Sequence, residues 1–217
     1  MPSSQAIETA RQYARWLSRS EQEVAADLES FAALLAKWQR VQNLVSRETL
    51  TDVWRRHIAD SLQVLRLVRA QDNVILDIGS GGGMPALPMA IGSKGVDRRF
   101  ILVEPNGRKV SFLRTVAREL DLAVSVLDKR SDEIDSRETP IPDVITSRAL
   151  APLPQLCAMA APFFGAKTRA IFHKGREHVE ELAEAGALWH YDVVIHKSDT
   201  DPQGVLLELS NLSLKNR

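Results

Sequence analysis

The pattern of apolar residues changes near residue 73, and this change restricts the possible folds more than any other feature of the chain. Before it, apolar side chains recur every three or four residues, and no glycine occurs before Gly79. Ser20 followed by Glu23 is typical of a capping box at the start of a helix. The sequence therefore predicts a helical lobe over residues 1–70.

Short apolar runs of strand length dominate the rest of the chain. There are seven of them: Asn73–Ile78, Phe100–Glu104, Ala123–Leu127, Asp143–Ser147, Arg169–His173, Tyr191–His196 and Val205–Ser210. Helical patterns fill most of the gaps: Pro85–Ile91, Arg108–Leu120, Leu153–Ala161 and Arg176–Ala187. This alternation predicts a doubly wound parallel sheet.

The last two strand-like runs are joined too closely for a crossover helix. Only Lys197–Gly204 lies between them, and it contains Pro202. We therefore expect an antiparallel hairpin, with the last strand reversed. A seven-stranded doubly wound sheet of this kind is the arrangement of class I S-adenosylmethionine-dependent methyltransferases. The predicted fold class for residues 71–217 is thus an α/β methyltransferase domain, preceded by the helical lobe.

Composition excludes several classes of protein. In 217 residues, 28 Lys and Arg balance 28 Asp and Glu, which excludes a nucleic-acid binder driven by bulk charge. The single cysteine, Cys157, excludes an internal disulfide or a cysteine-rich metal site and favours a reducing, cytoplasmic setting. Charges throughout the first 30 residues argue against a targeting signal. The uncharged run Ala149–Ala166 is interrupted by prolines, so we expect no membrane span.

A cluster of glycines follows the first predicted strand, in the sequence Asp77-Ile-Gly-Ser-Gly-Gly-Gly-Met84. Glycines at 79, 81 and 83 allow tight turns and close approach of the backbone to a ligand. Met84 stands where the dinucleotide fingerprint needs its third glycine, so that fingerprint is not met. The remaining pattern is similar to the S-adenosylmethionine loop of class I methyltransferases. We predict cofactor contacts at Asp77, Gly79, Gly81, Gly83 and Met84.

Two further segments complete the predicted cofactor site. Glu104 ends the second predicted strand, 21 residues after Gly83, where an acid accepts both ribose hydroxyls of an adenosine. After the third strand, Ser131 and Asp132 are the residues expected beside the adenine. The alternative for this pair is an exposed, charged helix start, with Ser131 or Asp132 as its N-cap.

The loop after the fourth strand indicates which atom accepts the methyl group. It reads Thr146-Ser-Arg-Ala-Leu-Ala-Pro152 and lacks the (Asp/Asn)-Pro-Pro-(Tyr/Phe) motif of amino-nitrogen methyltransferases of this fold. Methylation of a base at C5 uses a cysteine nucleophile, but Cys157 lies in an apolar helical pattern, where it packs as a small hydrophobe. A ring nitrogen such as guanine N7 needs no general base. The enzyme then works mainly by alignment.

Residues 144–176 contain no Asp or Glu, although the chain as a whole is neutral. This stretch predicts a basic rim for a phosphate-bearing substrate, formed by Lys167, Arg169, Lys174 and Arg176. The alternative is a chance acid-free stretch of buried residues.

The chain resembles the bacterial 16S ribosomal RNA guanine-N7 methyltransferases, also called glucose-inhibited division protein B, over roughly residues 34–176. The most specific matches are His57 with Asp60-Ser61, and Ser147-Arg148-Ala149. The others are Trp38, Asn43-Leu44, Leu62, Asp77–Pro85, Val103-Glu104, Lys109, Phe112-Leu113 and Lys174-Gly175. One departure is Ala86, where the family usually has glycine; we expect it to begin a helix, where a methyl group is tolerated.

The resemblance implies S-adenosylmethionine as donor and a guanine of 16S ribosomal RNA, alone or in the small ribosomal subunit, as acceptor. It implies cofactor contacts at Gly79, Met84, Ser131, Asp132 and Arg148, and Arg148 is expected to orient the cofactor or the base. We expect a cytoplasmic monomer. Two alternatives stay open: a donor-binding ribosome-assembly factor without turnover, and a small-molecule methyltransferase.

His57, Asp60 and Ser61 fall on one helical face at spacings of three and four. That face meets either the cofactor loop and the RNA, or the sheet. We favour a polar cluster that joins the lobe to the sheet, and we assign no proton transfer to His57.

Overall fold

The first third of the chain is helical, as predicted. A computed structural model describes residues 1–46 and 51–215 of this protein. Its lobe contains α1 (Ser4–Gln12), η1 (Ala14–Trp16), α2 (Glu21–Gln39), η3 (Trp54–Ala59), α3 (Asp60–Leu62) and η4 (Gln63–Leu67). The capping box of α2 is confirmed, because the Ser20 hydroxyl accepts from the backbone of Glu23 and the Glu23 carboxylate accepts from the backbone of Ser20.

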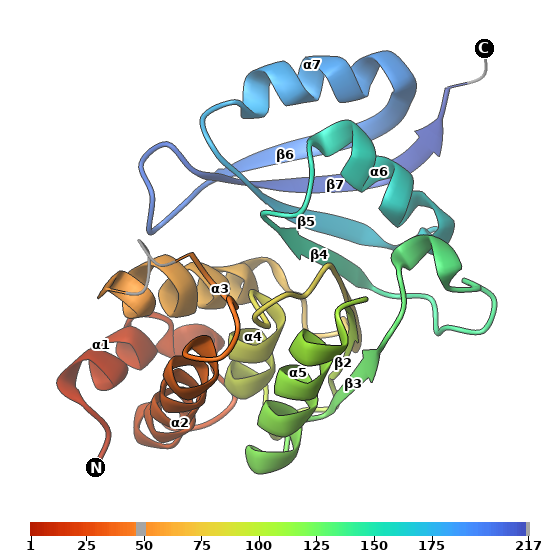
Figure 1. Cartoon of the computed structure of the whole chain (residues 1–217). Helices are drawn as coiled ribbons and strands as arrows, with labels where there is room; N and C mark the ends of the chain where they lie inside the picture. The colour runs from red at the N-terminus through yellow and green to blue at the C-terminus, as the bar shows by residue number, and fades with distance from the viewer. Residues whose placement is uncertain (47–50, 216–217) are drawn as a thin grey trace.

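Seven strands form one sheet in the order β3-β2-β1-β4-β5-β7-β6 (Figure 1). They are β1 (Val74–Ile78), β2 (Arg99–Val103), β3 (Val124–Leu127), β4 (Val144–Arg148), β5 (Arg169–Lys174), β6 (Trp189–Lys197) and β7 (Val205–Leu214). The first five run parallel, and β7 is antiparallel to both β5 and β6. The predicted fold class, including the reversed last strand, is confirmed.

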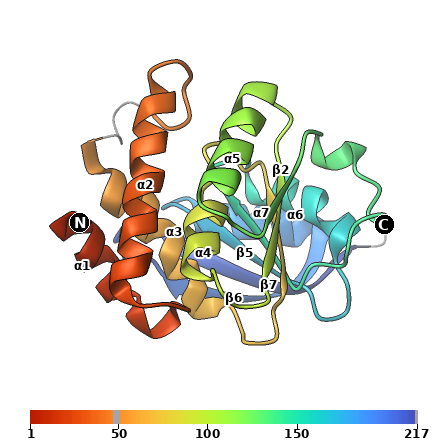
Figure 2. The ribbon, with the colours of Figure 1, turned by 90° about the horizontal axis from the view of Figure 1, so that it is seen from below.

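Helices cover both faces of this sheet (Figure 2). They are α4 (Ala86–Gly92), α5 (Gly107–Glu119), α6 (Leu153–Ala160) and α7 (His178–Leu188), with short 3₁₀ turns η5 (Ser131–Glu133) and η6 (Ala161–Phe163). Alternate strand residues enter different cores, as a two-residue period requires. Ile75 packs with the lobe, α4 and α5, whereas Leu76 packs with α6 and α7. Ala86 begins α4, as expected.

The lobe shares a single apolar core with one face of the sheet. Phe112 of α5 lies between two aromatic rings of α2, with ring centroids 6.5 Å from Phe31 and 5.8 Å from Trp38. Burial of large rings is a major stabilising contribution in such contacts. The lobe is therefore held firmly beside the edge where the parallel strands end. Within the described residues, no helix is both long and apolar enough to cross a membrane.

Candidate active site

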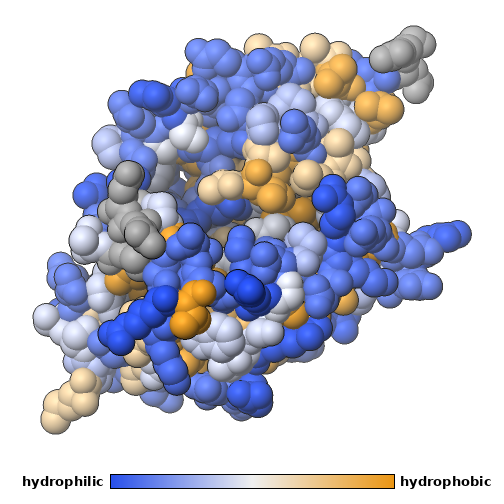
Figure 3. All heavy atoms as spheres, viewed as in Figure 1, coloured by the Kyte–Doolittle hydropathy of each residue, from blue (hydrophilic) through white to orange (hydrophobic). Residues whose placement is uncertain are grey.

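A cavity of about 860 Å³ opens at the carboxyl edge of the parallel strands. Its walls come from the lobe, the glycine loop after β1, the ends of β4 and β5, and the hairpin between β6 and β7. Figure 3 shows apolar side chains gathered near the middle of this face, over the loop between β4 and α6. Ligand sites of doubly wound folds lie at this edge.

The glycine loop has a backbone that ordinary side chains would disturb. Gly79 and Gly81 have φ values of +71° and +54°. A Cβ at Gly79 would lie 2.6 Å from the Leu150 side chain, which would have to shift, and the φ of +71° would be strained for any other residue. A Cβ at Gly81 would meet no atom closer than the Gly79 carbonyl oxygen at 3.8 Å. The loop thus presents bare backbone to the cavity, as a closely bound ligand requires.

Glu104 is held against this loop by backbone amides. Its side chain is 5% exposed; Oε2 accepts from the Gly81 N–H at 2.8 Å and Oε1 from the Asn106 N–H at 2.9 Å. Each carboxylate oxygen keeps a second lone pair, which matches the two ribose hydroxyls of an adenosine. The bare loop and this oriented acid therefore fit S-adenosylmethionine.

A second cavity, of about 480 Å³, adjoins the first, and Gly79 and Leu150 line both. Ser131 and Asp132 lie on its wall with apolar residues of α6, as a flat aromatic base requires. The alternative interpretation is confirmed in part: Ser131 and Asp132 begin the 3₁₀ turn η5 and Asp132 is exposed, but the N-cap is Arg130.

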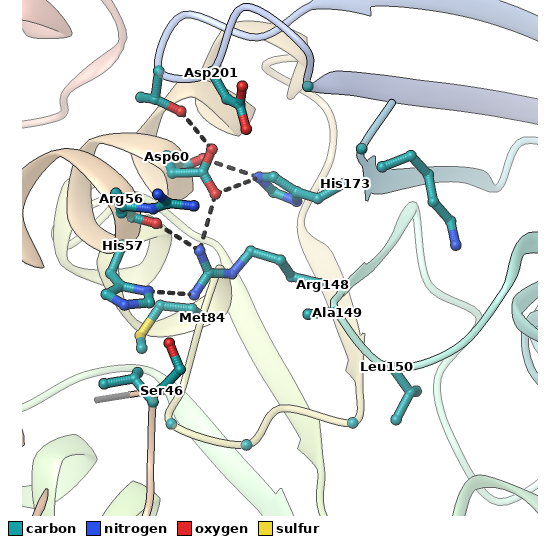
Figure 4. Close-up of a pocket in the computed structure, with 18 of the residues that line it drawn as sticks. Ser46, Arg56, His57, Asp60, Met84, Arg148, Ala149, Leu150, His173 and Asp201 are labelled. Carbon is teal, nitrogen blue, oxygen red and sulfur yellow. Dashed lines mark hydrogen bonds and ion pairs between the residues drawn. The ribbon is translucent and has the colours of Figure 1, made fainter. Parts of the chain in front are cut away.

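Arg148, at the end of β4, binds the lobe through three contacts (Figure 4). Nη1 donates to the Arg56 carbonyl oxygen at 2.8 Å and to Asp60 Oδ2 at 3.0 Å, and Nη2 donates to His57 Nδ1 at 2.7 Å. The ring of His173 completes the cluster by donating from Nε2 to the Asp60 carbonyl oxygen at 2.9 Å. These contacts agree with the favoured interpretation of a polar cluster between lobe and sheet.

Ser61 is the member of the predicted trio that does not reach the cavity. Its hydroxyl donates to the His57 carbonyl oxygen at 2.6 Å, and the residue is fully buried. The lobe helix is a π-helix over Trp54–Ala59, which changes the face presented by each residue.

Burial and charge set the protonation states around the cavity. Burial, reinforced by the Arg148 guanidinium, lowers the pKa of His57 to about 4, so the ring is neutral at pH 7. Burial opposes ionisation of Asp60, but His173, Arg148 and the Thr200 hydroxyl hold its pKa below the usual value. Burial raises the pKa of Cys157 to about 12, which agrees with a packing role.

Asp77, near the end of β1, and Gly83, within the glycine loop, line neither cavity. Asp77 is fully buried, and its Oδ1 accepts from the Thr146 hydroxyl at 2.7 Å. Burial raises the pKa of this carboxyl to about 7. Gly83 turns the chain with a φ of +85°. Both residues shape the loop, whereas Gly79, Gly81, Met84, Glu104 and Arg148 line the first cavity.

The predicted basic rim is only partly present. The prediction for Arg169 is wrong: its side chain is 5% exposed and forms ion pairs with Asp72 and Glu208. It begins β5, so it lies at the edge opposite the cavity, as does the exposed Lys167 just before it. The ammonium of Lys174 is also committed within the protein, to Glu181 at 2.6 Å and the Ala151 carbonyl at 2.7 Å. Arg176 is exposed.

Sequence reasoning missed two walls of the cavity. Arg55 and Arg56 of the lobe are exposed at its margin, and Ser198, Thr200 and Asp201 line it from the β6–β7 hairpin. The position of the hairpin at the cavity could have been predicted, because a reversed β7 beside β5 brings the end of β6 to the carboxyl edge. Among residues 1–46 and 51–215, no group of His, Cys, Asp or Glu is arranged to hold a metal ion.

This sheet order, with a glycine loop and an acid at the ends of its first two strands, defines a class I S-adenosylmethionine-dependent methyltransferase. The fold is similar to that of a mutant of MtNAS in complex with S-adenosylmethionine, with a TM-score of 0.57 and 13% identity over 86% of this chain and 75% of that one. The family model for rRNA small subunit methyltransferase G matches residues 24–202. The chain belongs to this family.

Curated relatives agree with this assignment. Ribosomal RNA small subunit methyltransferase G of Cereibacter sphaeroides is 40% identical over 193 residues, which cover 88% of this chain and 92% of the relative. The protein of the same name from Rhizobium meliloti is 40% identical over 203 residues, covering 92% and 94%.

Proposed function

We propose that this protein transfers a methyl group from S-adenosylmethionine to N7 of a guanine in 16S ribosomal RNA. The observation that carries the choice of acceptor atom is that neither His57 nor Cys157 is available to act on the acceptor as a base or a nucleophile. The Nδ1 lone pair of His57 already accepts from Arg148. Cys157 is buried and lines neither cavity. Guanine N7 carries its own lone pair and needs no deprotonation.

Bound S-adenosylmethionine supplies an electrophilic methyl group on a sulfonium centre. Glu104 would hold the ribose hydroxyls of the bound donor, and Ser131 and Asp132 would lie beside its adenine. Arg148 fixes the loop after β4 by its three contacts with the lobe, so that Ala149 and Leu150 keep one position against the glycine loop. Alignment of this kind is the main contribution such a site makes, with effective molarities of roughly 10⁵ M or more.

The proposal also covers the RNA substrate, the cellular compartment and the oligomeric state. Exposed Arg55 and Arg56 at the cavity margin, with Arg176, supply the charge for RNA phosphates. N7 lies in the deep major groove of an A-form helix, so the acceptor guanine belongs to a loop or an irregular region. We further propose that the chain acts in the cytoplasm as a monomer, with residues 1–70 as a lobe on the methyltransferase domain 71–217.

Methyl transfer from labelled S-adenosylmethionine tests the proposal directly. Small-subunit RNA and small subunits from cells lacking the protein are the substrates, and borohydride–aniline cleavage locates N7-methylguanine. We expect label at one guanine and chain cleavage at the same position. A folded protein that binds the donor but transfers no label to either substrate would refute the proposal and favour an assembly factor.

A further inference from the structure

The β6–β7 hairpin is clamped to the helical lobe across the cavity. Arg66 Nη1 pairs with Asp199 Oδ1 at 2.7 Å, and the Asp199 N–H donates to Gln63 Oε1 at 2.8 Å. The Thr200 hydroxyl donates to Asp60 Oδ1 at 2.7 Å. These contacts fix the backbone of residues 199 and 200. The next residue, Asp201, is therefore held in place on the cavity wall.

The carboxylate of Asp201 has capacity to bind a ligand. Oδ1 accepts from the Gln203 N–H at 2.9 Å, and no cation of the described residues lies within 4.0 Å of this side chain. Two of the other acids that line the cavity, Glu104 and Asp60, are occupied by contacts within the protein. Glu104 binds two backbone amides, and Asp60 accepts from Arg148, Thr200 and Gln63. A carboxylate at a cavity wall with a free oxygen is a strong acceptor for paired N–H donors.

Guanine offers such a pair of donors on the edge opposite N7. When N7 faces the methyl donor, N1–H and the exocyclic amino group point to the far wall. Asp201 lies across the Arg148 cluster from Met84, which follows the glycine loop (Figure 4). We propose that the Asp201 carboxylate accepts from N1–H and the N2 amino group of the acceptor guanine, and so selects guanine. This inference rests on the proposed function.

The same contact favours the reaction as well as the choice of base. The N7 lone pair forms the new nitrogen–carbon bond, the electron pair of the broken carbon–sulfur bond stays on sulfur, and no proton leaves. The positive charge consequently moves onto the purine, and its N–H groups become stronger donors. A carboxylate on these groups stabilises the transition state more than the ground state.

A guanine-to-inosine exchange tests the proposal, because inosine lacks only the N2 amino group. The acceptor position is mapped first with wild-type protein, and ligated small-subunit RNA is then made with guanosine or inosine there. We expect wild-type kcat/KM to favour guanosine by roughly 10- to 100-fold, the range for one or two good base-edge contacts. Asp201→Asn keeps an acceptor for the Gln203 N–H but turns a donor toward the base. It should lower the ratio to below about threefold.

Asp52→Asn is the matched control, since Asp52 lines the same cavity with the same charge. We expect it to keep the wild-type ratio, and both variants to bind S-adenosylmethionine as the wild type does. Three results would each overturn the role of Asp201: a wild-type guanosine-to-inosine ratio of kcat/KM near one, the wild-type ratio in Asp201→Asn, or a ratio near one in Asp52→Asn. Failure of the wild type to methylate the guanosine RNA would instead refute the proposed function.

Discussion

Replacing Arg169 by methionine separates a structural role from an RNA-binding role. The guanidinium bridges Asp72 and Glu208 in the interior and also donates to the Leu67 carbonyl oxygen at 3.0 Å. Methionine keeps much of the side-chain volume but leaves two carboxylates without this partner. We therefore expect Arg169→Met to destabilise the fold and to leave the affinity for RNA unchanged.

The magnitude follows from what remains around the two acids. Removing one partner of a buried ion pair costs about 3–5 kcal/mol. Asp72 still accepts from the Arg69 backbone at 2.7 Å, and Glu208 still pairs with His196 at 2.8 Å. These contacts place the loss near the lower limit, at about 3 kcal/mol. For a chain of this length, the thermal midpoint should fall by about 6–12 °C.

Thermal unfolding followed by circular dichroism measures the first effect, and filter binding of small-subunit RNA at 10 °C measures the second. Lys167→Met is the matched control: it removes an exposed cation two residues away and should move the midpoint by less than 2 °C. The reasoning would be refuted if Arg169→Met kept the wild-type midpoint and lost more than fivefold in RNA affinity, since the guanidinium would then contact RNA.

Three further predictions concern the cofactor loop and the interior. Gly79→Ala should weaken donor binding at least tenfold by calorimetry, because the φ of +71° is strained for alanine and its Cβ would displace the Leu150 side chain. Gly107→Ala is the control, since its Cβ meets no atom within 4 Å, and it should bind the donor as the wild type does. Buried Cys157 should resist a thiol reagent at pH 8 until the protein unfolds, and rapid labelling of the native state would contradict its placement. Folding raises the pKa of Asp77 from 3.8 to about 7, so its contribution to stability is complete below pH 4 and is lost as the pH rises through 7. The free energy of unfolding of Asp77→Asn relative to wild type should therefore increase between pH 5 and pH 8.5 in urea titrations, and a constant difference would count against the raised pKa.

Local features of this protein were predictable from sequence because they depend on neighbours in the chain. Ser20 and Glu23 cap a helix within three residues, and the glycine loop is fixed by its own φ angles. The strands could be recognised from short apolar runs, and the brevity of Lys197–Gly204 predicted the reversal of β7. In each of these cases, the residues of one short segment determine the local structure.

Sequence reasoning failed for side chains whose interaction partners lie far away in the sequence. An acid-free stretch looked like a basic rim, but Asp72 and Glu208 reach Arg169 from 97 and 39 residues away. The direction of β5 also places Arg169 and Lys174 at opposite edges of the sheet, which a count of charges ignores. Arg148 lines the cavity, but no sequence pattern indicated the bonds that orient its guanidinium, which come from the lobe, 88 to 92 residues earlier.

The position of β7 has a consequence for the protein during its own synthesis. This strand is made last but lies between β5 and β6, so β6 has no place in the sheet until β7 is inserted. A chain still emerging from the ribosome already carries the lobe, the glycine loop and Glu104, but lacks the hairpin wall with Asp201. Domains fold as units once their long-range pairings are available. The site is thus incomplete until β7 has been synthesised and has paired with β5 and β6.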